Sequence, residues 1–292
     1  MHVRRRRPGT VKSRELCERS PEATKIPDKR KALSGTAAAQ EFEQAPEPDG
    51  PAGYIHSVET GAAADGPGMR FVFFLAGCSF RCLYCHNPDT WTFGGSRPVS
   101  VRAAVAEAAR YAGFLRMAGG VTLSGGDPLA QAEFAGELLR RLHDGLGLHT
   151  ALDTQGFLHR KVEDRWFDAL DLVLLDIKHI DPVRHRDVTG RPLQPTLDFA
   201  RRLVRLGKPM WIRYVLVPGL TDDAEDIARL ADTAAGLGPL VERVELLPFH
   251  QLGSHKWAGL NRPYRLAATP VPSASQIAAA AAIIRSRGLT VS

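Results

Sequence analysis

Three cysteines lie within eight residues, in the stretch Cys78-Ser-Phe-Arg-Cys82-Leu-Tyr-Cys85. Three thiolates on one loop can ligate three irons of a [4Fe-4S] cubane, a cluster that four cysteines usually close. The fourth iron then lacks a protein ligand and can chelate the amino and carboxylate groups of an amino acid. A sulfonium on that molecule would lie close enough to receive an electron. The remaining cysteine, Cys17, lies far away in a polar stretch and is not expected to be the fourth ligand.

Other readings of the cysteine loop remain open from the residues alone. Cys82-Leu-Tyr-Cys85-His86 matches the attachment pattern of c-type haem, although that pattern does not use a third cysteine. A Cys₃His zinc site that includes His86 has the right number of ligands, but adjacent Cys85 and His86 are awkwardly placed to bind one tetrahedral ion. The cysteines could also be structural, although structural cysteines tend to be buried singly.

The cysteine loop directly follows an apolar run, Arg70-Phe-Val-Phe-Phe-Leu-Ala-Gly77, which is typical of a buried strand. From there the sequence alternates between short β-rich runs and stretches of helical periodicity. We expect strands near 70–77, 121–124, 149–153, 172–177, 210–217 and 241–247. Helices are expected near 99–117, 129–146, 160–170, 195–207, 222–237 and 273–288, the last beginning after Ser273 and ending at Gly288.

This rhythm predicts the α/β class, with a parallel sheet that is covered by helices and joined by right-handed crossovers. Six such units would form an open or partial (β/α)6 barrel. Sites in parallel sheets lie beyond the carboxyl ends of the strands, so polar residues at those ends should converge. The residues expected there are Cys78, Gly125, Gly126, Asp127, Asp153, Thr154, Asp176, Lys178, Arg213 and His250.

Residues 1–50 combine Pro, Glu, Lys, Arg and Ala with almost no aromatic or β-branched residues. Such a composition buries too little surface to offset chain entropy, so we expect a disordered basic extension there and one domain over 51–292. The first 50 residues hold 11 Lys and Arg against 8 Asp and Glu, which is half of the net charge of +6. The body is therefore only mildly basic, and nucleic acid is not an expected partner.

Several features bear on the compartment. The cysteine pattern differs from the even-numbered framework of a secreted disulfide-rich domain, so a reducing compartment is expected. No apolar stretch of signal-peptide length follows Arg4–Arg7, and no uninterrupted apolar run reaches ~18 residues. We therefore expect a cytoplasmic protein without a membrane partner.

The CxxxCxxC loop, with aromatic Tyr84 before its last cysteine, resembles the radical S-adenosylmethionine signature. The flanking sequence resembles the activating enzymes of glycyl-radical enzymes, and most of all the pyruvate formate-lyase type. This resemblance covers roughly residues 53–290. The stretches that carry it are Ile55-His-Ser-Val-Glu59, Asp65-Gly-Pro-Gly-Met-Arg70, Gly77 to Pro88, Asp89-Thr-Trp91, Leu152-Asp-Thr154, Trp211-Ile-Arg-Tyr214, Leu246-Leu-Pro-Phe-His250 and His255-Lys-Trp257.

The resemblance implies one [4Fe-4S] cluster on the three cysteines, S-adenosylmethionine as cofactor and a radical SAM type of partial barrel. Ser124-Gly-Gly-Asp127 resembles a family motif that ends in glutamate, so Gly126 is a safer cofactor contact than the shorter Asp127. Asp153, Thr154 and Asp176 resemble ligands of a monovalent cation. The expected cofactor-binding residues are Tyr84, His86, Gly125, Gly126, Asp127, Asp176, Lys178, Arg213 and His250.

The reaction implied by the resemblance is reductive cleavage of S-adenosylmethionine to methionine and a 5′-deoxyadenosyl radical, which removes a hydrogen atom from a glycine Cα of the partner enzyme. The partner is then a glycyl-radical enzyme of the pyruvate formate-lyase type, and the Asp65-Gly66 segment lies near its glycine loop. Since no cysteine follows Cys85, a single cluster is expected, with flavodoxin or ferredoxin as external electron donor and a monomeric enzyme.

Three alternative functions remain at this point. The chain could activate another glycyl-radical enzyme, such as anaerobic ribonucleotide reductase, or act as a radical enzyme on a small molecule. From a different class, it could be a zinc- or cluster-binding interaction module whose Arg-rich tail contacts nucleic acid.

Overall fold

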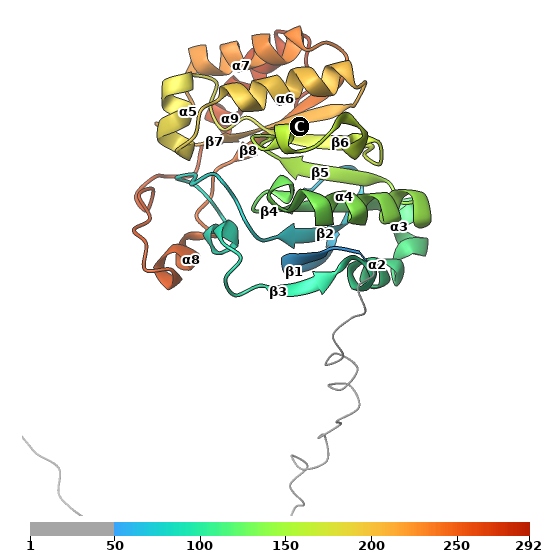
Figure 1. The fold of residues 1–292 in the computed structure, drawn as a ribbon. Helices are drawn as coiled ribbons and strands as arrows, with labels where there is room; N and C mark the ends of the chain where they lie inside the picture. The colour runs from blue at the N-terminus through green and yellow to red at the C-terminus, as the bar shows by residue number, and fades with distance from the viewer. Residues whose placement is uncertain (1–49) are drawn as a thin grey trace, which may run out of the picture. The chain divides into compact units, whose positions relative to one another are not determined.

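The computed structural model describes residues 50–292, so the expectations for residues 1–49 and for Cys17 lie outside the described part. The described residues build one eight-stranded sheet with the order β3-β1-β2-β4-β5-β6-β7-β8 (Figure 1). The strands are β1 (Ala52–Ala62), β2 (Met69–Leu75), β3 (Arg97–Ser100), β4 (Gly119–Gly125), β5 (Thr150–Thr154), β6 (Leu172–Asp176), β7 (Met210–Leu216) and β8 (Val241–Pro248).

Helices connect most of the successive parallel strands, whereas only short turns join β5 to β6. The α-helices are α2 (Val101–Ala109), α3 (Ala112–Ala118), α4 (Ala132–Arg140), α5 (Pro182–Thr189), α6 (Gln194–Arg205), α7 (Ala224–Gly236), α8 (Ser254–Gly259) and α9 (Ala274–Arg285). Shorter turns are η2 (Pro88–Trp91), η3 (Pro128–Gln131), the π-helical η4 (Arg141–Gly145), η5 (His159–Lys161) and η6 (Asp164–Phe167). No helix of residues 50–292 has the length and apolar character to cross a membrane.

The expected α/β architecture is confirmed. β2, β4, β5, β6, β7 and β8 pair in parallel and match the six expected strands. The strand order is linear, so the sheet does not close on itself, as expected for an open or partial barrel. β1 pairs antiparallel with β2 and β3, and these two strands, which extend the sheet beyond β2, were not expected.

Three expectations about helices need correction. The expected helix at 160–170 is wrong, because only the turns η5 and η6 form there. Val162, between these turns, is half-buried, and the charged residues beside it are exposed. The stretch 99–117 divides into α2 and α3 at Arg110 and Tyr111. α5 was missed because its sequence, Pro182–Thr189, has almost no apolar periodicity, although Asp181 caps its first turn.

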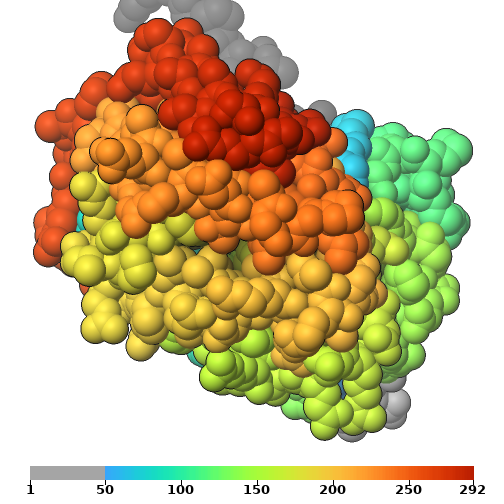
Figure 2. Space-filling view, turned by 90° about the horizontal axis from the view of Figure 1, so that it is seen from above, coloured from blue at the N-terminus to red at the C-terminus, as the bar shows by residue number. Residues whose placement is uncertain are grey.

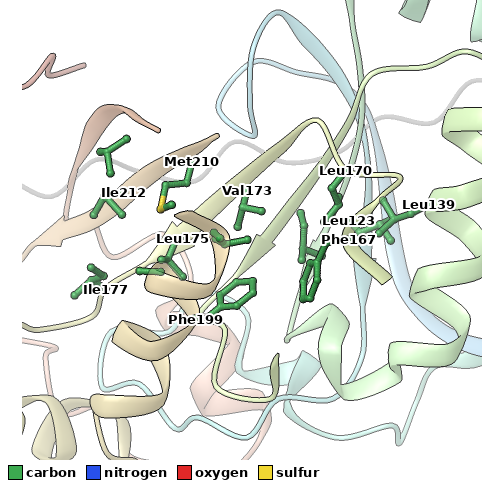
Figure 3. Packing of buried hydrophobic residues seen from close by; sticks show 14 of the residues in the cluster. Leu123, Leu139, Phe167, Leu170, Val173, Leu175, Ile177, Phe199, Met210 and Ile212 are labelled. Carbon is green, nitrogen blue, oxygen red and sulfur yellow. The ribbon is translucent and has the colours of Figure 1, made fainter. Parts of the chain in front are cut away.

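Side chains alternate between the two faces of the parallel strands, as the period of two requires. The outer face carries the main apolar core, to which the helices contribute residues such as Phe134, Phe199 and Leu230. Figure 3 shows this packing where Phe167 and Phe199 lie beside residues of β6 and β7. The inner face carries a small apolar cluster, Ala151, Leu172, Leu174 and Trp211, and polar residues nearer the carboxyl ends of the strands.

The C-terminal helix closes the outer layer. Ser273 and Gln276 form a capping box that begins α9 where the sequence predicted a helix start. α9 packs on α7, and Arg287 pairs with Asp232 at 3.0 Å; Figure 2 shows these red and orange segments side by side on one face. α7 and α9 thus cover the outer face of β8.

Candidate active site

The three cysteines lie on the loop that leaves the carboxyl end of β2. Backbone hydrogen bonds hold this loop to the following segment: Gly77 N donates to Thr90 O at 2.7 Å, and Cys78 N donates to Trp91 O at 3.2 Å. The Trp257 indole donates to Cys85 O at 2.9 Å, so α8 also fixes the loop. The cysteines are unpaired thiols.

The three cysteines face a cavity of about 260 Å³ at the carboxyl ends of the parallel strands. Most of the residues predicted from the sequence line it. They are Asp65, Cys78, Cys82, Tyr84, Cys85, His86, Gly125, Gly126, Asp153, Thr154, Asp176, Lys178 and Arg213. Gly66, Asp127 and His250 do not belong to this lining.

Strand register explains why charged residues meet in this cavity. Asp176 of β6 is the register partner of Arg213 in β7, and Arg213 is the register partner of Glu245 in β8. Residues in register on neighbouring parallel strands point to the same face of the sheet. A charged row therefore crosses the inner face where the cysteine loop lies.

The two bases of the site are paired with carboxylates. Lys178 Nζ lies 2.7 Å from Asp176 Oδ2, and Arg213 Nη1 donates to Asp153 Oδ2 at 3.2 Å. Arg213 also forms ion pairs with Glu245 at 3.1 Å and Asp65 at 3.8 Å.

This site holds more carboxylates than bases, so a cation in the cavity would be stabilised. The carboxylates of Asp65, Asp153, Asp176 and Glu245 face the ammonium and the guanidinium just described. One oxygen, Asp153 Oδ1, is buried without a hydrogen-bond partner. Because a buried acceptor without a partner is costly, this oxygen provides a ready contact for a bound ammonium or metal cation.

Burial shifts the pKa values of these groups. It raises the pKa of Asp65 to about 6, with a further contribution from Asp153 and an opposing one from Arg213. Burial also raises the pKa of Asp176, while Lys178 opposes this. For Arg213, burial alone lowers the pKa, but the surrounding carboxylates, Asp153 first, overcome it and raise the pKa. The Arg213 guanidinium therefore stays protonated at neutral pH.

Asp127 lies behind the cavity wall. It is fully buried, and its Oδ1 accepts from Thr154 Oγ1 at 2.7 Å and from Leu129 N at 3.2 Å. Its Oδ2 accepts from Gln155 Nε2 at 3.0 Å, and the same amide lies 3.7 Å from Cys78 Sγ. Asp127 thus positions the cavity wall through its hydrogen bonds to Thr154 and Gln155.

The two glycines at the end of β4, Gly125 and Gly126, are required by the protein backbone itself. A Cβ on Gly125 would lie 2.3 Å from Leu75 N, and one on Gly126 would lie 2.3 Å from Gly77 O. Gly125 also has a φ of +108°, a conformation that L side chains rarely adopt. The glycines therefore let β4 end tightly against the start of the cysteine loop.

The remaining predicted residues have clear neighbours. The Tyr84 hydroxyl donates to Lys178 O at 3.1 Å. His86 stacks on His250 with ring centroids 4.0 Å apart, so His250 reaches the cavity only through His86. The Thr154 hydroxyl already donates to Asp127 and accepts from Gly156 N, which leaves little of it for a cation.

Sequence reasoning missed several residues of the site. Ser124 donates to Asp153 Oδ2 at 2.6 Å, and Gln155 contacts Cys78. Both lie at strand ends, so the rule that selected their neighbours could have found them. Glu245 lies inside β8, and only its register with Arg213 shows that it belongs to the site.

The donor set fits an iron–sulfur cubane. Burial raises the pKa of the Cys78 thiol to about 12, so a thiolate there needs a metal to share its charge. Within residues 50–292, no three His, Cys, Asp or Glu side chains converge on a single metal ion. A cubane differs in that each thiolate binds its own iron, which suits three thiols arranged around a cavity.

Comparisons with known proteins agree with this geometry. Residues 72–231 match the Radical SAM superfamily. The chain is 46% identical over 222 residues to the pyruvate formate-lyase-activating enzyme of Staphylococcus epidermidis, covering 73% of this chain and 88% of that protein. It is 43% identical to the enzyme of the same name from Staphylococcus aureus, covering 81% and 96%.

A solved structure supports the fold. The radical SAM methyltransferase from Sphaerobacter thermophilus superposes with a TM-score of 0.56 at 20% identity, covering 76% of this chain and 65% of that one.

Proposed function

The chain belongs to the radical SAM superfamily and, within it, to the pyruvate formate-lyase-activating enzymes, and we propose that Cys78, Cys82 and Cys85 hold the [4Fe-4S] cluster of this enzyme. It is an enzyme that activates pyruvate formate-lyase by generating a glycyl radical, with S-adenosylmethionine as cofactor. This membership replaces the earlier alternative of an interaction module. The roles of individual residues, given next, are part of the proposal.

The reduced cluster, when bound, supplies one electron that cleaves S-adenosylmethionine into methionine and a 5′-deoxyadenosyl radical, which takes a hydrogen atom from the glycine Cα. The chain contributes orientation and charge around these reactants. The carboxylates of Asp153 and Asp176 favour cations, so we assign them to the ammonium of S-adenosylmethionine or to a monovalent cation beside it. Lys178 and Arg213 balance this charge and offer N–H donors to a carboxylate.

The observation that carries this assignment is the single cavity that three thiols share with a row of buried, paired charges from neighbouring strands. A structural cysteine cluster would need no such charges, since burying them costs free energy. Tyr84, His86, Gly125 and Gly126 line the same cavity and are assigned to cofactor contacts. Asp127 and His250 lie behind this layer and position it.

We assign the substrate glycine to the side of the cavity at Asp65. The Asp65 carbonyl accepts from Thr122 Oγ1 at 2.6 Å, and that hydroxyl accepts from Arg70 Nε at 3.0 Å. Arg70 is fully buried, so its guanidinium fixes this segment from inside the sheet. Asp65-Gly66 would thus present a rigid surface to the glycine loop of pyruvate formate-lyase.

The electron must come from outside the chain, because the sequence has no cysteine after Cys85 with which to bind a second cluster. We propose a flavodoxin or ferredoxin as the donor. We further propose that the enzyme acts as a monomer in the reducing environment of the cytoplasm, where thiols stay available for iron.

The test is the formation of the product radical. Reconstituted and reduced enzyme is mixed with S-adenosylmethionine and inactive pyruvate formate-lyase, and the glycyl radical is measured by electron paramagnetic resonance. We expect a glycyl signal and active pyruvate formate-lyase, and no signal when the acceptor glycine is replaced by alanine. An enzyme that consumes S-adenosylmethionine without producing the glycyl signal would contradict the assigned substrate.

A further inference from the structure

A groove beside the cysteine loop has no part in the assignments above. It encloses about 370 Å³ and runs between the segment after the cysteines and the segment after α8. Figure 1 shows α8 beside the sheet, next to the chain that follows β2. The residues that matter in this groove are His56, Arg81, Asp89, Trp91, Leu260 and Arg262.

Trp91 separates the groove from the cysteine cavity. It lines both hollows, and no other lining residue of the groove also lines the cavity. Its carbonyl accepts from Cys78 N at 3.2 Å, and its side chain hydrogen-bonds the Cys85 thiol. An indole ring, 7% exposed, is thus the wall between the surface groove and two of the cysteines.

The groove is cationic. The guanidinium groups of Arg81 and Arg262 lie over the Trp91 ring, 5.0 and 5.4 Å from its centroid. Asp89 is the acid that lines the groove, and it is already paired with Lys256 at 3.0 Å and with His56 at 3.1 Å. The two arginines therefore face solvent without an acidic partner in the groove.

The surrounding sequence has the same charge bias. No Asp or Glu follows Glu245, whereas the stretch between Glu245 and the start of α9 contains three basic residues, Lys256, Arg262 and Arg265. Between residues 76 and 100, Asp89 is the single acid. A cationic rim around a buried aromatic ring, with Leu260 partly exposed beside it, is the composition of a protein-binding surface that attracts an acidic partner.

We propose that this groove is the docking site of an acidic one-electron carrier protein of the flavodoxin or ferredoxin class, with Trp91 between the carrier and the cluster. This inference rests on the proposed function, which requires an external electron. The reduced carrier loses one electron and the cluster gains it, and no bond forms or breaks. The glycine loop is excluded as the occupant, because hydrogen-atom transfer needs direct contact with the cavity and Trp91 blocks it.

Arg262 is the better residue for the test. Arg81 donates to the carbonyls of Cys78 and Phe80, both at 2.7 Å, so its replacement would disturb the cysteine loop. Arg262→Glu reverses a charge of the groove and removes the guanidinium from the Trp91 ring, but it leaves the hydrogen bonds of the cysteine loop in place. Arg110→Glu is the matched control, because it makes the same charge change at an exposed position at the end of α2.

The experiment uses the reconstituted holoenzyme with a flavodoxin and a ferredoxin as probes. Affinity for each oxidised carrier is measured by titration, and cluster reduction by each reduced carrier is followed by absorbance. We expect Arg262→Glu to weaken binding and slow reduction about tenfold at 0.1 M salt, and less than about twofold at 1 M, where the Debye length is only about 3 Å. Arg110→Glu should stay within about twofold of wild type throughout.

Reduction by dithionite distinguishes an effect on carrier docking from an effect on the cluster itself. It should be equally fast in wild type and Arg262→Glu, because a small reductant does not need the groove. Equal behaviour of Arg262→Glu and Arg110→Glu with both carriers, or a wild type that neither carrier binds, would overturn the proposal. A dithionite-reduced wild type that leaves S-adenosylmethionine intact would instead overturn the proposed function.

A second variant tests the role of Trp91. Trp91→Leu should bind the carrier yet accept its electron more slowly, while Trp91→Phe, which keeps a ring, should be less affected. Iron content shows whether each variant still holds its cluster. If the bound carrier reduces the cluster of Trp91→Leu as fast as that of wild type, the electron does not pass through this side chain.

Discussion

Replacing Asp127 by alanine should destabilise the wall of the active site, although Asp127 does not line the cavity. Its carboxylate is the common acceptor for Thr154, Gln155 and the backbone of Leu129. In Asp127→Ala these three buried donors lose their partner. Gln155 also loses the contact that holds its amide beside Cys78.

The magnitude follows from two opposing contributions to the free energy of unfolding. Each buried donor left without a partner costs about 1–3 kcal/mol. Removing the carboxylate also relieves its burial cost, and burial raises the pKa of Asp127 from 3.8 to about 6, which corresponds to about 3 kcal/mol. The net loss should be about 3 kcal/mol, or a melting temperature lower by roughly 6–12 °C.

The assay is thermal unfolding of the apoprotein, with Asp223→Ala as the matched control. Asp223 accepts two backbone hydrogen bonds at the exposed start of α7, so its loss should cost only about 1 kcal/mol. Asp127→Glu should also cost about 1–3 kcal/mol, because the buried site has no room for another methylene. An Asp127→Ala protein with the same melting temperature as wild type would refute the positioning role of Asp127.

Three further predictions concern the same site. Gly126→Ala should disturb the cysteine loop, because its Cβ would lie 2.3 Å from Gly77 O, and reconstitution should yield less bound iron per chain than in wild type. Lys178→Met should lower the free energy of unfolding by about 3 kcal/mol, because it leaves the Asp176 carboxylate buried and unpaired; denaturant titration should show recovery when Asp176→Asn is added. Burial raises the pKa of Asp65 from 3.8 to about 6, so the folded state holds the proton on Asp65 more tightly than the unfolded chain does. The stability that this proton contributes is present at low pH and is lost as the pH rises from about 4 to about 6. Asp65→Asn should therefore flatten that part of a plot of melting temperature against pH.

The sequence predicted the parts of the fold that depend on local pattern. The strands β2 and β4 to β8 are apolar runs between helical stretches, and this pattern also placed Asp153, Asp176 and Arg213 near the cysteines. The start of α9 was predictable because Ser273 carries a capping signal in the sequence.

The parts that were missed depend on tertiary contacts. β1 has exposed charged and polar residues along much of its length, and it forms because β2 offers a free edge. Asp127 was expected to reach the cofactor, but it is fully buried, and its two side-chain donors, Thr154 and Gln155, come from a segment distant in sequence. The pairing of Arg213 with Glu245 required the strand register, which no short motif encodes.

The most direct test of the central claim is the formation of 5′-deoxyadenosine. Wild type, Cys82→Ala and the matched control Cys17→Ala are reconstituted with iron and sulfide without oxygen, reduced, and given S-adenosylmethionine. We expect wild type and Cys17→Ala to release 5′-deoxyadenosine and methionine, and Cys82→Ala to release none. A reconstituted wild type that leaves S-adenosylmethionine intact, or a Cys82→Ala variant that cleaves it as fast as wild type, would contradict the assignment of the cysteine loop.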